Sequence, residues 1–273
     1  FMKIGLIGSG NIAGAILDGL LSDKKKNQII CSDIDKKKLI KIKKDKKILI
    51  TTDNTKVVEK SELIFICVKP DSFNEVLSGI RKKSTTTKIF VSVAAGVKIN
   101  LIENLLGSDK KIIRTMPNLG CLVSEGVIAY KANPNCLKKD VKNFLALISK
   151  MGETLEIKKE SDFDHVTAIS GSGPAFLAEY ISSQLKFARS KKMNTRDSRL
   201  LIYKTILGTL KYFDKTNTSP TDFIKMVSSR GGTTIEGLKV LKNKKFNNTI
   251  IKCLDSTSRK SAKIAKILGG KKK

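Results

Sequence analysis

The chain of 273 residues carries 53 Lys and Arg against 25 Asp and Glu, a formal net charge of +28, and its length accommodates one large domain or two ordinary ones, each with a full core. Because the lysines are spread along the whole sequence, Trp is absent and aromatic residues make up only 5%, we expect no specific nucleic-acid partner. The five scattered cysteines form no C-x-x-C pair, which disfavours a disulfide framework and a zinc site. No apolar run approaches the roughly 20 residues of a membrane span, which disfavours a membrane anchor. Together these features favour a cytoplasmic protein.

Residues 3 to about 160 alternate short apolar runs with longer, lysine-rich amphipathic stretches, a rhythm typical of βαβ units. We expect strands at Lys3–Gly8, Gln28–Ser32, Ile48–Thr51, Leu63–Val68, Lys88–Val93, Lys111–Thr115, Gly126–Tyr130 and Thr154–Ile157. The cores of several are apolar almost without interruption, as in parallel strands that helices cover on both faces. Residues 1–160 are therefore predicted to form a Rossmann-type, doubly wound α/β sheet.

A glycine-rich turn follows the first expected strand directly and precedes a helical pattern. It consists of Gly8, Ser9, Gly10, Asn11, Ile12 and Ala13. In the dinucleotide-binding fingerprint, the first glycine makes a tight turn, the second admits the pyrophosphate, and the third small residue packs the helix on the strand. Its position in the chain favours a dinucleotide site over simple packing.

Asp33 ends the second expected strand, about 25 residues beyond Gly8. A carboxylate there would accept hydrogen bonds from the adenine-ribose hydroxyls and repel a 2′-phosphate, which favours NADH. Lys36–Lys38 follow at once, however, and could hold the 2′-phosphate of NADPH instead. Asp33 could equally be a helix N-cap, so the sequence leaves the choice between NADH and NADPH open.

Two later strands end in residues that suit the mouth of a nucleotide site. Val68-Lys69-Pro70 and Val93-Ala94-Ala95-Gly96 stand at expected carboxyl ends, where doubly wound sheets bind ligands. The small residues Ala94, Ala95 and Gly96 would let a nicotinamide lie close to the backbone. The alternatives are a solvated charge for Lys69 and an ordinary strand-to-helix turn for 94–96.

After Ser161 the apolar spacing becomes helical. Helices are expected near 162–170, 174–190, 195–213, 220–228, 233–242 and 246–267. Residues 161–273 are therefore predicted to form an all-helical domain, with a boundary within a few residues of 160.

The segment Met226–Leu241 combines two serines, two glycines and two threonines in front of a helical pattern. Glycines allow a close approach of the backbone to a ligand, and the first amides of a helix have no partners within it. The segment indicates an anion site surrounded by hydroxyls. The alternative is an ordinary turn capped by Thr233 or Thr234.

The chain resembles the pyrroline-5-carboxylate reductases essentially from end to end. The similar blocks are GSGNIA at 8–13, VKP at 68–70, VSVAAGV at 91–97, RTMPN at 114–118, VTAISGSGPAF at 166–176 and VSSRGGTTIEGLKVL at 227–241. The last two blocks are specific to the family, which disfavours another dinucleotide-binding reductase.

The resemblance implies reduction of the C=N bond of Δ1-pyrroline-5-carboxylate by hydride from NADPH or NADH, giving L-proline, the final step of proline biosynthesis. It implies a homodimer whose helical domains interleave, and larger rings of dimers in some members. Residues 161–273 would then be the substrate-binding and dimerisation domain.

The resemblance also assigns residues to the two ligands. Gly8 to Ala13 would lie at the pyrophosphate and Asn54 near the adenosine ribose. Val68, Lys69, Pro70, Ala95, Gly96, Met116, Pro117 and Asn118 would line the rest of the cofactor site. Ser229, Gly231, Gly232, Thr233 and Thr234 would cradle the substrate carboxylate, with Thr234 nearest the ring nitrogen as the catalytic residue.

Three places depart from the family pattern. Arg230 stands where proline is usual, which restores an amide and loosens a rigid turn. Leu119-Gly120-Cys121 replaces the usual Thr-Pro-Ala. His165, the sole histidine, stands where alanine is common and is interpreted as a surface or packing residue rather than a base.

Two other functions compete with this interpretation. A β-hydroxyacid dehydrogenase would share the architecture, but the lysine in a G-x-x-x-[NK] context expected of that class is not found. An inactive nucleotide sensor or a basic nucleic-acid-binding protein is the alternative outside the enzymes. The intact glycines at 8 and 10 and hydroxyls at 233 and 234 argue against a loss of activity.

Overall fold

The computed structural model describes residues 2–22 and 27–270 and divides into two compact units. One unit holds the described residues up to Pro174 together with those from Ser256 onward, and the other holds Ala175–Asp255. The first unit thus extends to Pro174, beyond the domain boundary expected near residue 160. The reason is that the segment after residue 160 packs on the sheet, where Phe163 is buried in a cluster with Ala129 and Ile157.

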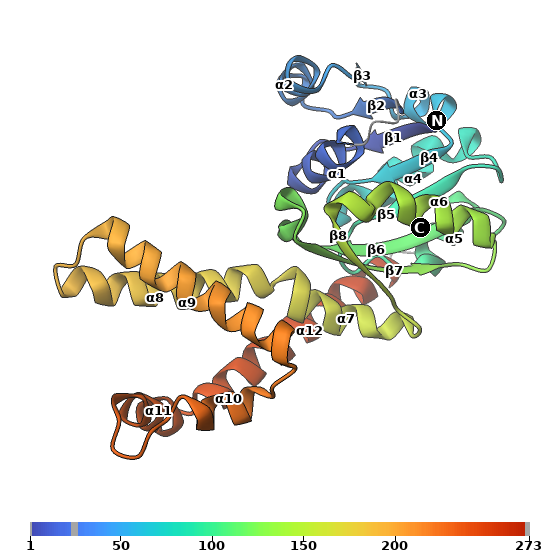
Figure 1. Cartoon of the computed structure of the whole chain (residues 1–273). Helices are drawn as coiled ribbons and strands as arrows, with labels where there is room; N and C mark the ends of the chain where they lie inside the picture. The colour runs from blue at the N-terminus through green and yellow to red at the C-terminus, as the bar shows by residue number, and fades with distance from the viewer. Residues whose placement is uncertain (1, 23–26, 271–273) are drawn as a thin grey trace. The chain divides into compact units, whose positions relative to one another are not determined.

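Eight strands among the described residues form one sheet, in the order β3-β2-β1-β4-β5-β6-β7-β8 (Figure 1). They are β1 (Lys3–Ile7), β2 (Gln28–Ser32), β3 (Leu49–Thr51), β4 (Leu63–Ile66), β5 (Ile89–Ser92), β6 (Lys111–Pro117), β7 (Gly126–Ala132) and β8 (Gly152–Glu156). β1 to β6 pair in parallel, so their carboxyl ends lie along one edge. The doubly wound architecture and every strand expected from the sequence are confirmed, with small differences at strand ends.

β7 runs antiparallel to β6, with Ile113 opposite Ala132. The connection at 118–125 holds only the 3₁₀ turn Leu119–Val123 and is too short for the crossover that a parallel pair needs. β8 then pairs in parallel with β7, after α6 (Lys138–Ile148) and the 3₁₀ turn Ser149–Met151. The sheet therefore consists of the parallel strands β1 to β6 and a second parallel pair, β7 and β8, joined by one antiparallel pairing.

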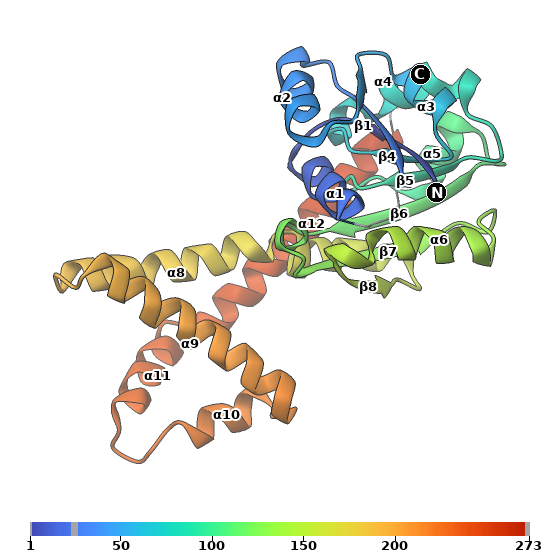
Figure 2. The same ribbon diagram turned by 45° about the horizontal axis from the view of Figure 1, so that its top comes forward.

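Helices lie on both faces of the sheet (Figure 2), and a hydrophobic core fills each side. Apolar residues of α1 (Asn11–Leu21), α2 (Lys36–Lys46) and α6 belong to one core. Those of α3 (Asn54–Lys60), α4 (Phe73–Ile80), α5 (Ile99–Leu106) and the end of α12 (Phe246–Gly270) belong to the other. In β4, Leu63 and Phe65 face the first core and Ile64 and Ile66 the second, which explains the uninterrupted apolar runs.

The described residues of the second unit form helices joined by loops, with no strand among them. It contains most of α8 (Gly173–Ser190), then α9 (Thr195–Thr216), α10 (Pro220–Met226), α11 (Thr233–Asn243) and the first part of α12. Pro220 is the first residue of α10 and Ser219 is its N-cap, as the sequence indicated. The all-helical class predicted for the second half is confirmed. Among the described residues, no helix combines the length and apolar character needed to cross a bilayer.

Candidate functional site

Two glycines join β1 to α1, and the structure requires only one of them to be glycine. Gly8 has φ of +97°, and a Cβ there would lie 2.9 Å from the backbone carbon and oxygen of Cys67. Gly10 has an extended conformation, and a Cβ there would meet nothing within 4 Å. Neither strain nor packing demands glycine at 10, so its missing side chain leaves room for a ligand.

The first turn of α1 presents unpartnered amides beside that open space. Gly10 is the N-cap, no side chain caps the helix, and its first turn contains no acidic residue. Ala13 is fully buried on the sheet side, while Ser9 and Asn11 frame the turn. A helix start with bare amides, a partial positive charge and glycine clearance fits a pyrophosphate.

Asp33 fastens the glycine-rich turn to the end of β2. Its Oδ2 accepts hydrogen bonds from the amide of Ser9 at 2.8 Å and from the Ser9 hydroxyl at 2.5 Å, and its Oδ1 accepts from the amide of Asp35 at 2.9 Å. The N-cap of α2 is Asp35, whose Oδ1 accepts from the amides of Lys37 and Lys38. The N-cap interpretation of Asp33 is therefore wrong by two residues.

Asp33 should add an acid-sensitive contribution to stability. Partial burial raises the pKa of this carboxyl, but the hydrogen bonds from Ser9 and Asp35 and the nearby Lys38 outweigh burial and hold the pKa below its usual range. A carboxyl whose pKa is lower in the folded state stabilises the fold above its unfolded pKa, and that contribution disappears as the pH falls through the folded value.

Denaturant unfolding at about pH 5 and about pH 2.5 should therefore show a larger acid-induced loss in the wild type than in Asp33→Asn. The difference is expected to stay below about 1 kcal/mol, because solvent still reaches and screens this partly buried group. Equal losses in both proteins would contradict the role given to these hydrogen bonds.

A cleft of about 610 Å³ gathers several predicted cofactor residues. Gly8, Asp33, Asn54 and Val68 all line it. The amide oxygen of Asn54 accepts a hydrogen bond from the Ser32 hydroxyl at 2.7 Å, which fixes the orientation of the amide. The remaining lining, which the sequence did not identify, comes from the end of β1, the turn before α2, the start of α3 and from α4: Ile7, Ile34, Thr52, Asp53, Thr55, Ser72, Glu75, Val76, Gly79 and Ile80.

The other predicted cofactor residues lie at the carboxyl ends of β4 and β5. Lys69 is exposed and precedes the 3₁₀ turn Pro70–Ser72. Ala95 and Gly96 follow β5, where Gly96 has φ of +75° and a Cβ would lie 2.8 Å from Cγ2 of Ile264 in α12. The structure thus gives Gly96 a packing reason to be glycine, and its contact with a nicotinamide stays a prediction.

Met116 and Pro117 end β6, and Asn118 follows it. This strand end contacts the π-helical turn Thr167–Gly171, which continues α7 (Phe163–Val166). Asn118 donates to the Ser170 hydroxyl at 3.1 Å and accepts from the amides of Gly120 and Val127. The methyl of Met116 fills the space where Gly171 lacks a side chain. Two sequence blocks that stand about 50 residues apart are therefore in contact.

Arg114 forms a buried ion pair next to this region. Its Nη1 donates to Oε1 of Glu160 at 2.9 Å, and its guanidinium lies 4.2 Å from the ring centre of Phe163. The same Glu160 oxygen accepts from the amide of Ile99, the first residue of α5, at 2.7 Å. One carboxylate thus joins β6 to the helix that follows Ala95 and Gly96. An arginine inside an apolar strand was the sequence signal for such a partner.

The predicted substrate residues lie together in one loop of the helical unit. Gly231 has φ of +76°, and the amide of Gly232 donates to the carbonyl of Ser229 at 2.9 Å. Gly232 is the N-cap of α11 and no side chain caps the helix, so capping by Thr233 or Thr234 is not observed. Ser229, Thr233 and Thr234 are exposed, so hydroxyls and bare amides surround the helix start, as at α1.

The residues that depart from the family pattern lie in loops, turns and at the surface. Arg230 is exposed in the same loop. His165 is exposed, and its Nδ1 lies 3.1 Å from the hydroxyl of Ser258, in keeping with a surface role. Leu119, Gly120 and Cys121 form most of the 3₁₀ turn that Asn118 caps.

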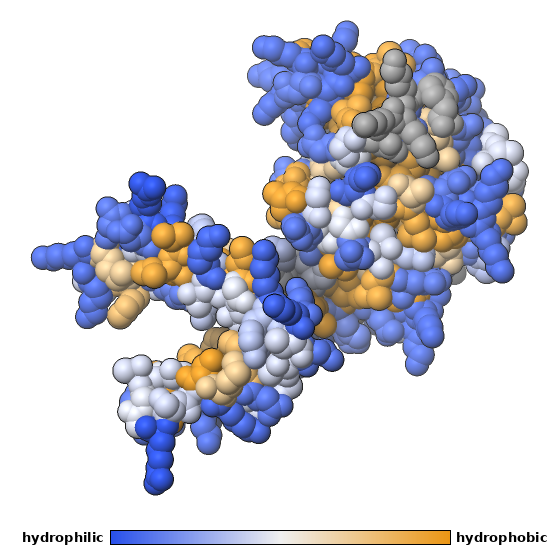
Figure 3. All heavy atoms as spheres, in the orientation of Figure 1, coloured by the Kyte–Doolittle hydropathy of each residue, from blue (hydrophilic) through white to orange (hydrophobic). Residues whose placement is uncertain are grey.

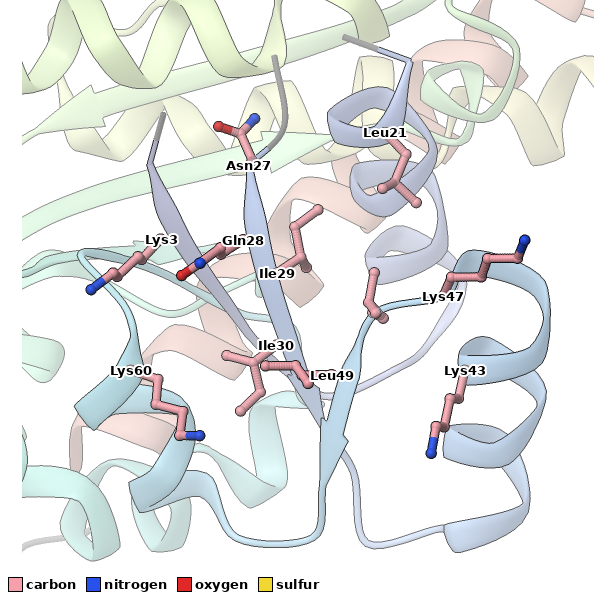
Figure 4. Close-up of a pocket in the computed structure, with 11 residues that line it drawn as sticks. Lys3, Leu21, Asn27, Gln28, Ile29, Ile30, Lys43, Lys47, Leu49 and Lys60 are labelled. Carbon is pink, nitrogen blue, oxygen red and sulfur yellow. The ribbon is translucent and has the colours of Figure 1, made fainter. Parts of the chain in front are cut away.

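A larger hollow of about 840 Å³ lies at the opposite end of the strands (Figure 4). Lys3, Lys43, Lys47 and Lys60 surround an apolar floor that includes Ile30 and Leu49. Lys3 and Gln28 begin β1 and β2, whereas doubly wound sheets bind their ligands at the carboxyl ends. Size alone therefore does not make this hollow the candidate site.

Profiles of two protein families match the chain. The profile described as "Pyrroline-5-carboxylate reductase dimerisation" matches residues 160–264. The profile described as "NADP oxidoreductase coenzyme F420-dependent" matches residues 3–96. Together they cover the helical half and most of the sheet.

Full-length relatives agree with the profiles. The chain is 32% identical to the pyrroline-5-carboxylate reductase of Aquifex aeolicus, over 96% of this chain and 97% of that one. It is 30% identical to that of Methanosarcina acetivorans, over 97% and 98% of the two chains. The crystal structure of Plasmodium falciparum pyrroline carboxylate reductase with NADP bound superposes with a TM-score of 0.89 at 27% identity, covering 97% of this chain and 98% of that one.

Proposed function

The chain belongs to the pyrroline-5-carboxylate reductase family, and from this premise we propose which of its residues serve the reaction. The protein reduces the C=N bond of Δ1-pyrroline-5-carboxylate with NADH or NADPH, giving L-proline, and it acts as a homodimer. The observation that carries the residue assignment is the start of α1, where Gly10 leaves space that neither packing nor strain requires.

Gly8, Ser9, Gly10, Asn11, Ile12 and Ala13 hold the pyrophosphate of the cofactor in this proposal. Asn54 lies at the adenosine ribose, supported by its place in the cleft with Gly8 and Asp33. Val68, Lys69, Pro70, Ala95, Gly96, Met116, Pro117 and Asn118 follow or end the strands β4, β5 and β6 and flank the remainder of the cofactor. Their support is the shared edge of the parallel strands, where ligands of this fold bind.

The bound cofactor supplies the hydride. The imine nitrogen must be protonated to accept it, and a free C=N is readily protonated near neutral pH, so the chain chiefly orients the substrate and tolerates its charge. The exposed position of His165 agrees with a reaction that needs no histidine base.

The substrate carboxylate rests on the start of α11 in this proposal. Amides at the first turn and the hydroxyls of Ser229 and Thr233 provide hydrogen-bond donors for an anion, while Gly231 and Gly232 keep the backbone accessible. Thr234, the second residue of α11, exchanges a hydrogen bond with the ring nitrogen as the amine forms.

Thr234→Ala is expected to lower kcat about 10- to 100-fold while the dissociation constant of the cofactor stays within about twofold, because the lost hydroxyl acts on the substrate nitrogen. Steady-state kinetics and cofactor titration separate the two effects. Thr221→Ala is the matched control, since Thr221 is also an exposed second residue of a helix, α10. Equal losses of turnover and cofactor binding in Thr234→Ala would remove Thr234 from the chemistry.

The assay that tests the whole proposal follows the absorbance of the reduced nicotinamide as purified protein meets Δ1-pyrroline-5-carboxylate. Oxidation that depends on both substrate and protein is expected with at least one of NADH and NADPH. Cofactor binding without oxidation would contradict the substrate loop and leave the nucleotide site intact.

Residues 161–273 form the substrate-binding and dimerisation domain in this proposal, supported by the profile match over 160–264. The helical domains of two subunits interleave, and dimers associate further into rings. Within the helical unit, Leu200, Leu201, Tyr203, Leu207 and Leu210 are 44–57% exposed along one helix, and Figure 3 shows apolar side chains at the surface of these helices. A partner subunit that covers them explains this exposure.

We place the protein in the cytoplasm. Burial and the nearby Asp33 raise the pKa of the Cys31 thiol to about 12, and burial is the main cause that raises the pKa of Cys136 to about 11. All five cysteines are free thiols in the structure, which suits a reducing compartment.

A further inference from the structure

The cleft beside the glycine-rich turn is acidic although the protein is strongly basic. Asp33, Asp53 and Glu75 line it, and its described lining includes neither Lys nor Arg. The whole chain has 53 basic and 25 acidic residues. The negative charge of the cleft lining is therefore opposite in sign to the net charge of the protein. Any ligand group that enters this cleft meets carboxylates.

Two of these carboxylates are held in fixed positions. Asp33 accepts the two hydrogen bonds from Ser9 on one oxygen, and on the other it accepts, from the part of the chain that the structure describes, the amide of Asp35 alone. Asp53 accepts from the amide of Thr55 at 2.8 Å and from its hydroxyl at 2.6 Å. Because Oδ1 of Asp33 keeps a free acceptor position, it can accept from a sugar hydroxyl.

The lysines after Asp33 do not line the cleft. Lys37 and Lys38 contribute their amides to the side chain of Asp35, and the ammonium of Lys38 lies 4.0 Å from Oδ2 of Asp35. The ammonium of Lys38 also lies near enough to Asp33 to lower the pKa of that carboxyl. Its charge is therefore already opposed by the carboxylates of Asp33 and Asp35.

Ile34 adds an apolar surface next to Asp33. Its side chain is 94% exposed and lines the cleft. A branched apolar side chain in open solvent costs free energy unless a ligand covers it, and the flat face of a purine base has the matching chemistry. The neighbouring carboxylate and apolar side chain suit an adenosine with free ribose hydroxyls.

We propose that this cleft binds the adenosine half of NADH and discriminates against the 2′-phosphate of NADPH, with Asp33 as the specificity-determining residue and Ile34 against the adenine. The proposal rests on the dinucleotide site proposed above. A 2′-phosphate would bring a dianion into a cleft that three carboxylates line, and like charges brought together at a binding site repel.

Direct titration without substrate tests the discrimination independently of turnover. NADH and NADPH are titrated separately into the purified dimer by calorimetry or by nucleotide fluorescence. NADH is expected to bind at least about tenfold more tightly than NADPH. As the salt concentration rises, the affinity for NADPH is expected to increase relative to the affinity for NADH, because salt screens the repulsion.

Asp33→Ser removes the carboxylate and keeps a hydroxyl for Ser9, and it should reduce the affinity ratio at least about fivefold. Asp35→Ser is the matched control, since serine still caps α2 and the lost charge is outside the cleft lining; its ratio should stay within about twofold. Glu75→Gln removes an exposed charge from α4 without touching the glycine-rich turn and should tighten NADPH binding alone.

Equal or tighter binding of NADPH by the wild type overturns the inference while leaving the reductase function in place. Unchanged ratios in both Asp33→Ser and Glu75→Gln overturn the roles of these carboxylates. Preferential NADH binding without oxidation by the substrate supports the inference and counts against the proposed substrate site. Binding of neither nucleotide overturns the dinucleotide site and the inference with it.

Discussion

Gly10→Ala is expected to weaken the binding of NADH and NADPH at least about 100-fold, a loss of about 2.7 kcal/mol, while the protein unfolds within a few degrees of the wild type. A Cβ at Gly10 meets nothing within 4 Å in the protein, so the fold accommodates it. The methyl group instead occupies the space from which a pyrophosphate reaches the amides of α1. Nucleotide titration and thermal unfolding measure the two effects.

The same segment contains two control glycines. Gly14 lies inside α1 and a Cβ there also meets nothing within 4 Å, so Gly14→Ala should stabilise the helix by about 0.5–1 kcal/mol and leave nucleotide binding unchanged. Gly8→Ala should unfold the turn, because of the positive φ and the contact with Cys67. If Gly10→Ala binds nucleotides as tightly as Gly14→Ala does, α1 does not hold the pyrophosphate.

Glu160→Ala is expected to destabilise the protein by about 3 kcal/mol. The substitution leaves the guanidinium of Arg114, whose side chain is 3% exposed, without its carboxylate, and the amide of Ile99 without its acceptor. Burial already lowers the pKa of Arg114, and Glu160 opposes that effect. Denaturant unfolding at one fixed protein concentration measures the loss, since a dimer unfolds in a concentration-dependent way.

Glu236→Ala is the matched control for this experiment. Glu236 pairs with Lys239 at 2.7 Å on the exposed surface of α11, where the two side chains are 69% and 62% exposed. Such pairs contribute at most about 0.5 kcal/mol. If Glu160→Ala loses no more than Glu236→Ala, the buried pair does not hold α5 and β6 together.

The strands and helices could be predicted because their apolar spacing reflects burial directly. Leu63–Ile66 is apolar at every position because alternate side chains enter two different cores. The antiparallel β7 could not be predicted from its own composition, since orientation follows from the length of the preceding connection rather than from the strand.

The reasons for individual residue types were harder to predict than their positions. Gly10 and Gly96 both stand in family-like motifs, yet Gly10 borders open space whereas Gly96 makes way for Ile264, which is about 170 positions away in the sequence. Asp33 and Asp35 are both suited to cap a helix, and a difference of two residues decides which one does. Ile34 has an apolar side chain that composition alone places in a core, and it is instead nearly fully exposed.

The return of α12 to the sheet has a consequence for synthesis on the ribosome. Leu268 is buried with Ala94 and Val97, although the segment Ala175–Asp255 belongs to the other unit. The unit that contains the glycine-rich turn therefore cannot complete its second core until residues beyond Ser256 have been translated. An apolar surface over β5 stays uncovered during that interval and is open to aggregation, and closing the core requires a contact of high sequence separation that slows folding.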